Sequence, residues 1–278
     1  MFVNGTLAKL GKKPVVLDRR QDSTILQFGK YRLRPLGKPI PNLPTSPPAE
    51  VSWITKLAEA QALPMYLNDQ LGCCVEAAAG HMIQQWSFYA GKPVLPADAD
   101  ILKAYEDVGG YVPGDPNTDN GTDMLQFLNY WQSTGVGGHK ILAYMAVDWT
   151  NADEVQDAID IFGNLYTGVA LPVSCQGAND WTVPDGGIYG SAGQPGGWGG
   201  HCIPFVASSP ITKTCLTWGS VLKASHNFFA DYVDEAFVVL SQDWIEANGL
   251  SPSLLDLAQL EADLGQFKVH LNVTAIAK

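Results

Sequence analysis

A reactive thiol could form where the polar, turn-prone segment 68–72 runs into Cys73 and Cys74. The residues after these cysteines are apolar at helical spacing, so Cys74 is predicted to stand at a helix N-terminus. Unpaired N–H groups and the positive end of the helix dipole favour a thiolate there, and would lower the pKa of the cysteine from its usual value of about 8.5. A plainer interpretation is that both cysteines are small apolar core residues, as most intracellular cysteines are.

His201 could supply a base for this thiol. It follows the glycine-rich stretch 196–200 and begins an apolar, strand-like run that continues to Val206. Glycines there allow close backbone approach, which suits the wall of a cleft. His81 lies seven residues after Cys74, about 10.5 Å along a helix at 1.5 Å per residue, and is therefore expected to be structural.

Three short segments in this order resemble the papain-like cysteine peptidases. A cysteine at a helix N-terminus is followed, 127 residues later, by the strand-borne His201, and 17 residues further on by Trp218-Gly219 at the end of the next strand. These spacings are close to that family's pattern. The segment Asn-Asp-x-x-Gly-x-Cys, the Gly-Gly-His and the Thr-Trp-Gly also resemble little-characterised papain-like proteins of phages and prophages, over roughly residues 50 to 245.

The resemblance implies a role for each matching residue. Cys74, two residues after Gly72, would be the nucleophile, and His201 would take its proton. The family's glutamine six residues before the nucleophile, which donates to the oxyanion, aligns with Asn68, while Gln70 lies four residues before it. Either amide could donate, and Asn68 is preferred.

The third group of the family's site is replaced in this sequence. The family's Asn-Ser-Trp-Gly aligns with Leu216-Thr217-Trp218-Gly219, and leucine cannot orient an imidazole. Strand alternation is expected to point Thr217 away from the face that carries Trp218. Three alternatives follow: a Cys-His dyad, an orienting group from elsewhere, or a protein that has kept the fold and lost the reaction.

Composition limits the class of protein. The 278 residues contain 46% apolar and 16% charged residues, which fits one large domain or two lobes with a substantial core. A net charge of −11 argues against nucleic acid as a partner, and no apolar run is long enough to span a membrane. Five cysteines without a Cys-x-x-Cys pair indicate neither a disulfide framework nor a metal site, and no cofactor is expected. The start of the chain lacks a signal-peptide layout, so synthesis in the cytoplasm is expected, with possible association with a virion.

Residues 1–50 differ from the rest because they are basic and end in a proline-rich stretch. We interpret them as an N-terminal arm, which could cross the body like a propeptide, tether the protein to a partner or to another copy, or extend into solvent. Since acidic residues concentrate in the remaining chain, arm and body should attract.

The body, residues 51–278, is predicted to have an α+β fold of two lobes. The first lobe, about 51–163, should contain helices at 74–90, at 98–106, from a cap at Thr122 to 132, and from a cap at Asn151 to 162. The second, about 164–245, should be rich in antiparallel strands, including 166–173, and a C-terminal helix is expected at about 253–267. The segment 115–121 is interpreted as an Asx-rich turn rather than a calcium loop.

The long glycine-rich loop 174–200 carries Trp181 and Trp198 near the predicted histidine. These side chains could line a groove for a peptide or protein substrate, or could anchor the loop. The sequence thus leaves two main functional hypotheses: a papain-like thiol hydrolase acting on peptide or amide bonds, and a catalytically weak or inactive papain-like structural or binding protein, including a phage virion component. A thiol amidase acting on cell-wall peptides is a third, which Trp218-Gly219 disfavours.

Overall fold

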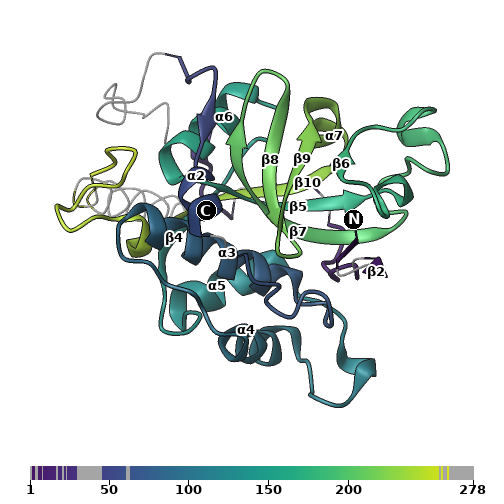
Figure 1. The fold of residues 1–278 in the computed structure, drawn as a ribbon, viewed down its shortest axis with the longest axis horizontal. Helices are drawn as coiled ribbons and strands as arrows, with labels where there is room; N and C mark the ends of the chain where they lie inside the picture. Colours follow the sequence, from purple (N-terminus) through teal and green to yellow (C-terminus); the bar gives the residue numbers. More distant parts are fainter. Residues whose placement is uncertain are drawn as a thin grey trace, which may run out of the picture.

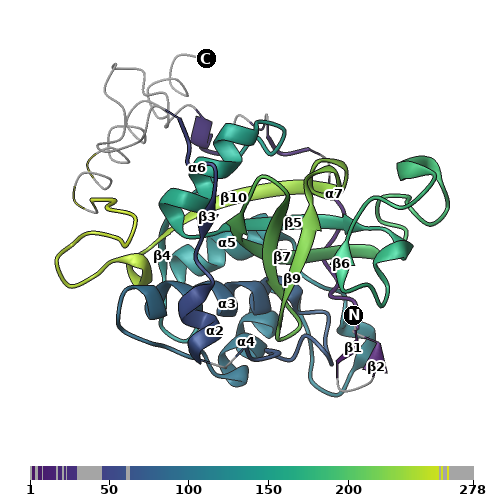
Figure 2. The same ribbon diagram turned by 45° about the horizontal axis from the view of Figure 1, so that its top comes forward.

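The computed structural model describes residues 2–3, 6–7, 9–16, 18–20, 22, 24–29, 46–60, 63–256, 258 and 262. A group of helices packs on one side of a large sheet, while further helices cover its other side (Figures 1 and 2). The α+β class expected from the sequence is confirmed. In the described part of the chain, no helix is long and apolar enough to cross a membrane.

The helices differ mainly in length, and the longest is central. The α-helices are α2 (Thr55–Ala60), α3 (Cys74–Tyr89), α4 (Asp98–Ala104), α5 (Met124–Ser133), α6 (Ala152–Phe162) and α7 (His226–Tyr232). Single-turn helices are the π-helical η1 (Tyr105–Gly109) and the 3₁₀ turns η2 (Pro116–Thr118), η3 (Val173–Cys175), η4 (Gly187–Tyr189) and η5 (Gln242–Trp244).

The strands form one large sheet and one small hairpin. The strands are β1 (Phe2–Val3), β2 (Thr6–Leu7), β3 (Val51–Ser52), β4 (Ile141–Ala146), β5 (Leu165–Leu171), β6 (Asp180–Trp181), β7 (Gly199–Ser208), β8 (Thr212–Thr217), β9 (Ser220–Ser225) and β10 (Val233–Ser241). The sheet has the order β4-β10-β5-β7-β8-β9-β6, with β3 also paired to β7, and β1 pairs with β2. Among the described strands, the pairings are antiparallel except that of β6 with β9.

Two apolar cores lie on the two sides of the sheet. On β5, Leu165 and Val169 belong to a core shared with α6 and α7, whereas Tyr166 belongs to a core shared with α3 and α5. Helix α3 is buried on all faces, because small residues such as Ala77, Ala78 and Ala79 let its neighbours approach closely. Its first residue, Cys74, is therefore held rigidly between the helical side and the sheet.

Several local predictions agree with the structure and two need correction. Helices α3 and α6 have nearly the predicted bounds, and Asn151 caps α6 through a bond from the Glu154 N–H. The α5 cap is Asp123, which accepts the N–H groups of Leu125 and Gln126, and not Thr122. Strand β5 ends at Leu171 rather than at 173. Most of the predicted helix at 253–267 lies outside the described residues.

Candidate active site

Cys74 and His201 meet where α3 abuts β7. Both side chains are buried, and Gly11 of the arm lies against both. A Cβ atom on Gly11 would stand 2.6 Å from Cys74 Sγ and 2.6 Å from His201 Nδ1, so these two atoms are at most twice that distance apart. In the described part of the chain, His201 Nδ1 has no hydrogen-bond partner. The structure thus brings the predicted thiol and base together, with the arm backbone at Gly11 against both.

The other side of the imidazole is fixed by two neighbouring residues. His201 Nε2 lies 2.8 Å from the Thr217 hydroxyl, and the ring stacks on Trp218 with centroids 4.3 Å apart and planes inclined by 14°. If Nε2 carries the proton, it donates to Thr217, and the Nδ1 lone pair is directed toward the Cys74 side. The hydroxyl is therefore a suitable acceptor for the tautomer that a base for this thiol requires.

The prediction that Thr217 points away from Trp218 was wrong. Strand β8 ends at Thr217, and Trp218 has a φ of +47°, so the alternation of side chains stops between the two residues. Both side chains consequently reach His201. Leu216, the residue aligned with the family's asparagine, instead packs with Leu57 and Val206 in a separate small core.

The two candidate oxyanion donors differ in exposure. Asn68 is 3% exposed in a tight turn in which Tyr66 and Leu67 both have positive φ, and the Tyr66 carbonyl lies 3.5 Å from Cys73 Sγ. The turn is therefore held against the start of α3. The Gln70 side chain is exposed, and the backbone carbonyl of Gln70 accepts a bond from Lys9 of the arm.

The described part of the arm crosses this site and is bonded to both of its walls. The Lys12 N–H donates to the Gly72 carbonyl on the helical side at 3.1 Å, and the Lys13 N–H donates to the Gly200 carbonyl on β7 at 3.1 Å. Between the hairpin at its start and the sheet, the arm runs close to the beginnings of α3 and β7 (Figure 1). Gly11 is the residue that allows this passage, since any side chain there would overlap Cys74 and His201.

With the arm in place, both reacting groups are neutral at neutral pH. Burial raises the pKa of Cys74 to about 12, with Glu76 adding to the effect, and burial lowers the pKa of His201 to about 3. The sequence predicted the opposite direction for the cysteine from its place at a helix N-terminus. That prediction fails for the covered state, because removal of the thiolate from water outweighs the helix dipole.

Two acidic residues beside the site were not identified from the sequence. Glu76, two residues after Cys74 in α3, is fully buried, and burial raises its pKa to about 7. Asp119 accepts the Gly72 N–H and the Tyr105 hydroxyl, each at 2.7 Å, and pairs with arm lysines. It lies within the predicted Asx-rich turn, whose side chains gave no signal of this long-range contact.

The two loop tryptophans have different positions. Trp181 is 1% exposed and packs against Trp218 and Phe228, so the prediction that it lines a groove is corrected: it is a core residue behind the histidine's tryptophan. Trp198 is half-buried, with its ring centroid 5.9 Å from that of Trp218. Only Trp198 is thus placed where an incoming chain could touch it. His81 of α3 is buried, with its ring against that of Tyr66, as expected of a structural histidine.

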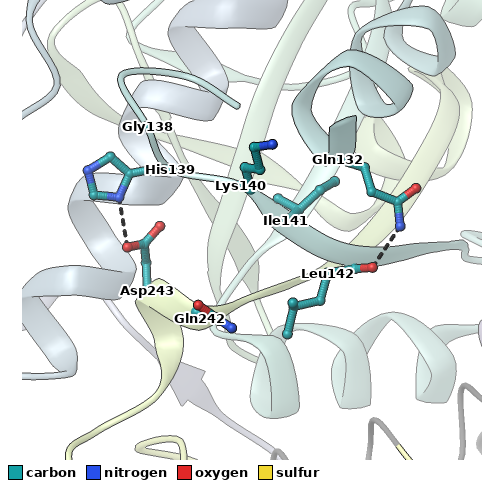
Figure 3. Close-up of a pocket in the computed structure, with 8 residues that line it drawn as sticks. All are labelled: Gln132, Gly138, His139, Lys140, Ile141, Leu142, Gln242 and Asp243. Carbon is teal, nitrogen blue, oxygen red and sulfur yellow. Dashed lines mark hydrogen bonds and ion pairs between the residues drawn. The ribbon is translucent and has the colours of Figure 1, made fainter. Parts of the chain in front are cut away.

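A separate surface pocket is formed by residues from the α5–β4 connection and η5. His139 Nδ1 lies 2.8 Å from Asp243 Oδ1 at its edge, and the carboxylate raises the pKa of His139 (Figure 3). None of the predicted site residues lines this pocket. Within the described residues, no three histidine, cysteine, aspartate or glutamate side chains are grouped so that they could hold a metal ion.

Comparison with known proteins supports the fold. No protein-family model and no curated protein matches the sequence. Among solved structures, xylellain, a cysteine protease from Xylella fastidiosa, matches with a TM-score of 0.59 and 12% identity over 86% of this chain and 99% of that chain. The procathepsin B S9 from Trypanosoma congolense matches with a TM-score of 0.56 and 10% identity over 84% and 87% of the respective chains. At such identity the likeness shows the fold, which is papain-like.

Proposed function

We propose that this papain-like chain is a thiol hydrolase of peptide or amide bonds. The observation that carries the proposal is the fixed imidazole of His201, bonded to Thr217 at Nε2 and facing the Cys74 side with an unpartnered Nδ1. A general base requires a free nitrogen beside the thiol whose proton it takes, and the second bond, to Thr217, holds the ring in place. The papain-like fold supports the same reaction class by analogy.

In the proposed reaction, His201 Nδ1 takes the proton of the Cys74 thiol as the sulfur attacks the carbonyl carbon of the substrate. Thr217 accepts the Nε2–H bond and stabilises the imidazolium that forms. His201 then returns the proton to the leaving amine, which leaves a thioester on Cys74. A water molecule, deprotonated by the same imidazole, hydrolyses the thioester and restores the thiol.

Oxyanion stabilisation is assigned to the Cys74 backbone N–H and the Asn68 side chain. The supporting observations are the helix N-terminus at Cys74 and the burial of Asn68 in the adjoining turn. Donors held rigidly in a site shielded from water need no reorganisation when charge develops. The exposed Gln70 is the less suitable donor.

We also propose that the full chain is latent until the arm leaves the cleft. The arm backbone occupies the space beside Cys74 and His201 that a substrate carbonyl would need. Burial under the arm also keeps the thiol protonated at neutral pH, as its raised pKa indicates. The first requirement for activity is therefore displacement of residues 9–13.

The proposal is tested by displacing the arm within the full chain. A Cβ on Gly11 would stand 2.1 Å from the Cys74 Cβ, so Gly11→Val cannot coexist with the covered state. We expect Gly11→Val to cleave unfolded casein and to be alkylated by iodoacetamide at Cys74, and we expect the unmodified chain to do neither at a comparable rate. Val15→Ala, at an exposed arm position, is the matched control. Both activities should vanish in Gly11→Val with His201→Ala.

Rapid alkylation without hydrolysis of any peptide would contradict the proposal. That outcome would favour the alternative of a papain-like binding or structural protein, including a virion component. The sequence argument for the alternative was Leu216, and the Thr217–His201 bond weakens it. The hydrolase is therefore preferred.

A further inference from the structure

Lys13 of the arm is buried with two carboxylates. Its side chain is 0% exposed, and its Nζ lies 3.0 Å from Asp234 Oδ2 and 2.8 Å from Glu235 Oε1, with a further bond to the Pro14 carbonyl at 2.6 Å. The Glu235 side chain is also 0% exposed and that of Asp234 is 11% exposed. Each of the three N–H bonds of the ammonium group thus has an oxygen acceptor, in a recess that excludes solvent.

The recess is shaped for a long side chain. Gly168 of β5 forms part of its wall, where an added Cβ would stand 2.5 Å from Lys13 Cε and 2.7 Å from Asp234 Oδ1. Any larger residue at 168 would therefore fill the space that the lysine stem occupies. We call the recess formed by Gly168, Asp234 and Glu235 the acidic pocket.

The acidic pocket opens beside the reacting groups. Lys13 is two residues from Gly11, which lies against Cys74 and His201, and the Lys13 N–H bonds to the Gly200 carbonyl directly before the histidine. Lys13 and Gly200 form an isolated antiparallel bridge, so β7 presents a backbone acceptor to an extended chain. Such main-chain bonds accept any sequence, whereas an adjoining pocket selects a side chain.

We propose that the acidic pocket is the specificity pocket of the proposed hydrolase and takes a lysine or arginine side chain of an incoming peptide, two residues from the residue that faces Cys74. This inference rests on the proposed function and adds the substrate class to it. The arm occupies the pocket in the covered state by presenting the same kind of side chain.

Charge explains why the pocket would select a cation. When residues 9–13 leave, Asp234 and Glu235 lose Lys13, whereas Arg19, whose Nη1 lies 2.9 Å from Glu235 Oε2, still faces Glu235. Two neighbouring carboxylates then share one guanidinium, which leaves a negative charge in the recess without a counter-charge, and this is costly. A basic side chain removes that cost, whereas a neutral one leaves it and an acidic one increases it.

The experiment uses the full chain with Gly11→Val to open the cleft and Cys74→Ala to prevent turnover. Binding of two fluorescein-labelled peptides that copy residues 8–16 is measured by anisotropy, one with methionine in place of Lys13 and one with methionine in place of Lys12. The two peptides have the same net charge, so the general attraction between a basic peptide and the acidic body affects both equally and cancels when their affinities are compared. We expect the peptide that lacks Lys13 to bind at least tenfold more weakly.

The pocket residues are tested in the same background. Glu235→Gln should remove most of the difference between the two peptides, and Asp234→Asn should reduce it and serves as the second variant if Glu235→Gln does not fold. Asp231→Asn, an exposed acid three residues before Asp234, should leave the difference unchanged. Each variant is accepted only if its thermal unfolding matches that of its parent.

The outcomes separate this inference from the proposed function. Equal binding of the two peptides, or no binding of either to a protein whose cleft is open, would overturn the acidic pocket. A preference for Lys13 without any hydrolysis in Gly11→Val would sustain the pocket and count against the hydrolase. Hydrolysis of a peptide library without enrichment of lysine or arginine at one fixed position would sustain the hydrolase and overturn the pocket.

Discussion

Replacement of Thr217 by valine tests whether its hydroxyl orients the His201 imidazole for the proposed reaction. Thr217→Val keeps the shape of the side chain and removes the oxygen 2.8 Å from His201 Nε2. A hydrogen bond to a charged group contributes about 1.5–3 kcal/mol, and the imidazolium exists only after the proton leaves the thiol. Since about 1.4 kcal/mol corresponds to a factor of ten, kcat/KM should fall about 10- to 150-fold.

The assay is hydrolysis of a fluorogenic peptide by the Gly11→Val protein with and without Thr217→Val. Thr217→Ser retains the hydroxyl and should stay within a few-fold of its parent. The pH profile of Cys74 alkylation separates orientation from a structural effect. Loss of the acceptor destabilises the thiolate–imidazolium pair, so the pH range of rapid alkylation should narrow in Thr217→Val and remain wide in Thr217→Ser.

Leu216→Asn is the complementary variant. If asparagine were needed at this aligned position, the substitution would raise activity. Because Leu216 is buried with Leu57 and Val206, we instead expect no gain and a loss of about 1–3 kcal/mol in the free energy of unfolding. Unchanged activity in Thr217→Val, or higher activity in Leu216→Asn, would refute our assignment of the third group.

Three further predictions concern the covered state and its surroundings. Because the pKa of Cys74 under the arm is about 12, the rate of its alkylation in the unmodified chain should rise about tenfold per pH unit from pH 7 to 9. The rate is measured by mass spectrometry, and a rate that does not change over this range would contradict the burial argument. Burial lowers the pKa of His81 from 6.5 to about 4, so the stability that depends on neutral His81 is complete above pH 6.5 and is lost as pH falls toward 4. The free energy of urea unfolding should therefore differ between pH 7.5 and 4.5 by about 2–3 kcal/mol less in His81→Leu than in the parent, and an unchanged difference would be evidence against this role. Asp119→Asn should lower the free energy of unfolding by about 1–3 kcal/mol, because the carboxylate accepts the Gly72 N–H. It should also speed alkylation of Cys74, because the carboxylate pairs with Lys9 and Lys12 of the arm. A slower reaction with iodoacetamide would be inconsistent with that role.

The candidate site residues that the sequence could indicate are those set by local pattern. A turn-prone segment before helical spacing located Cys74, and glycines before an apolar run located His201. The asparagine at 151 identified the start of α6 because capping depends on residues within one turn.

The remaining features depend on contacts that the sequence pattern does not encode. The role of Thr217 follows from the positive φ of Trp218, which is rare for a tryptophan and ends the strand alternation one residue early. The protonated state of Cys74 follows from coverage by a segment more than 60 residues away in the chain. The placement of Lys13 against Asp234 and Glu235 joins residues separated by more than 200 positions.

The attachment of the arm at β4 affects how any substrate could compete with it. The Leu26 carbonyl accepts the Ala146 N–H at 2.7 Å on this edge strand, and Phe28 is fully buried with its ring 5.6 Å from that of Phe162. If residues 9–13 lift away while this attachment holds, their return is intramolecular, and a short tether gives an effective concentration on the order of millimolar. A free peptide present at micromolar concentration would therefore rarely displace the arm. Durable opening would require a cut between Gly11 and Leu26, after which the segment that covers Cys74 and His201 would diffuse away and no longer return.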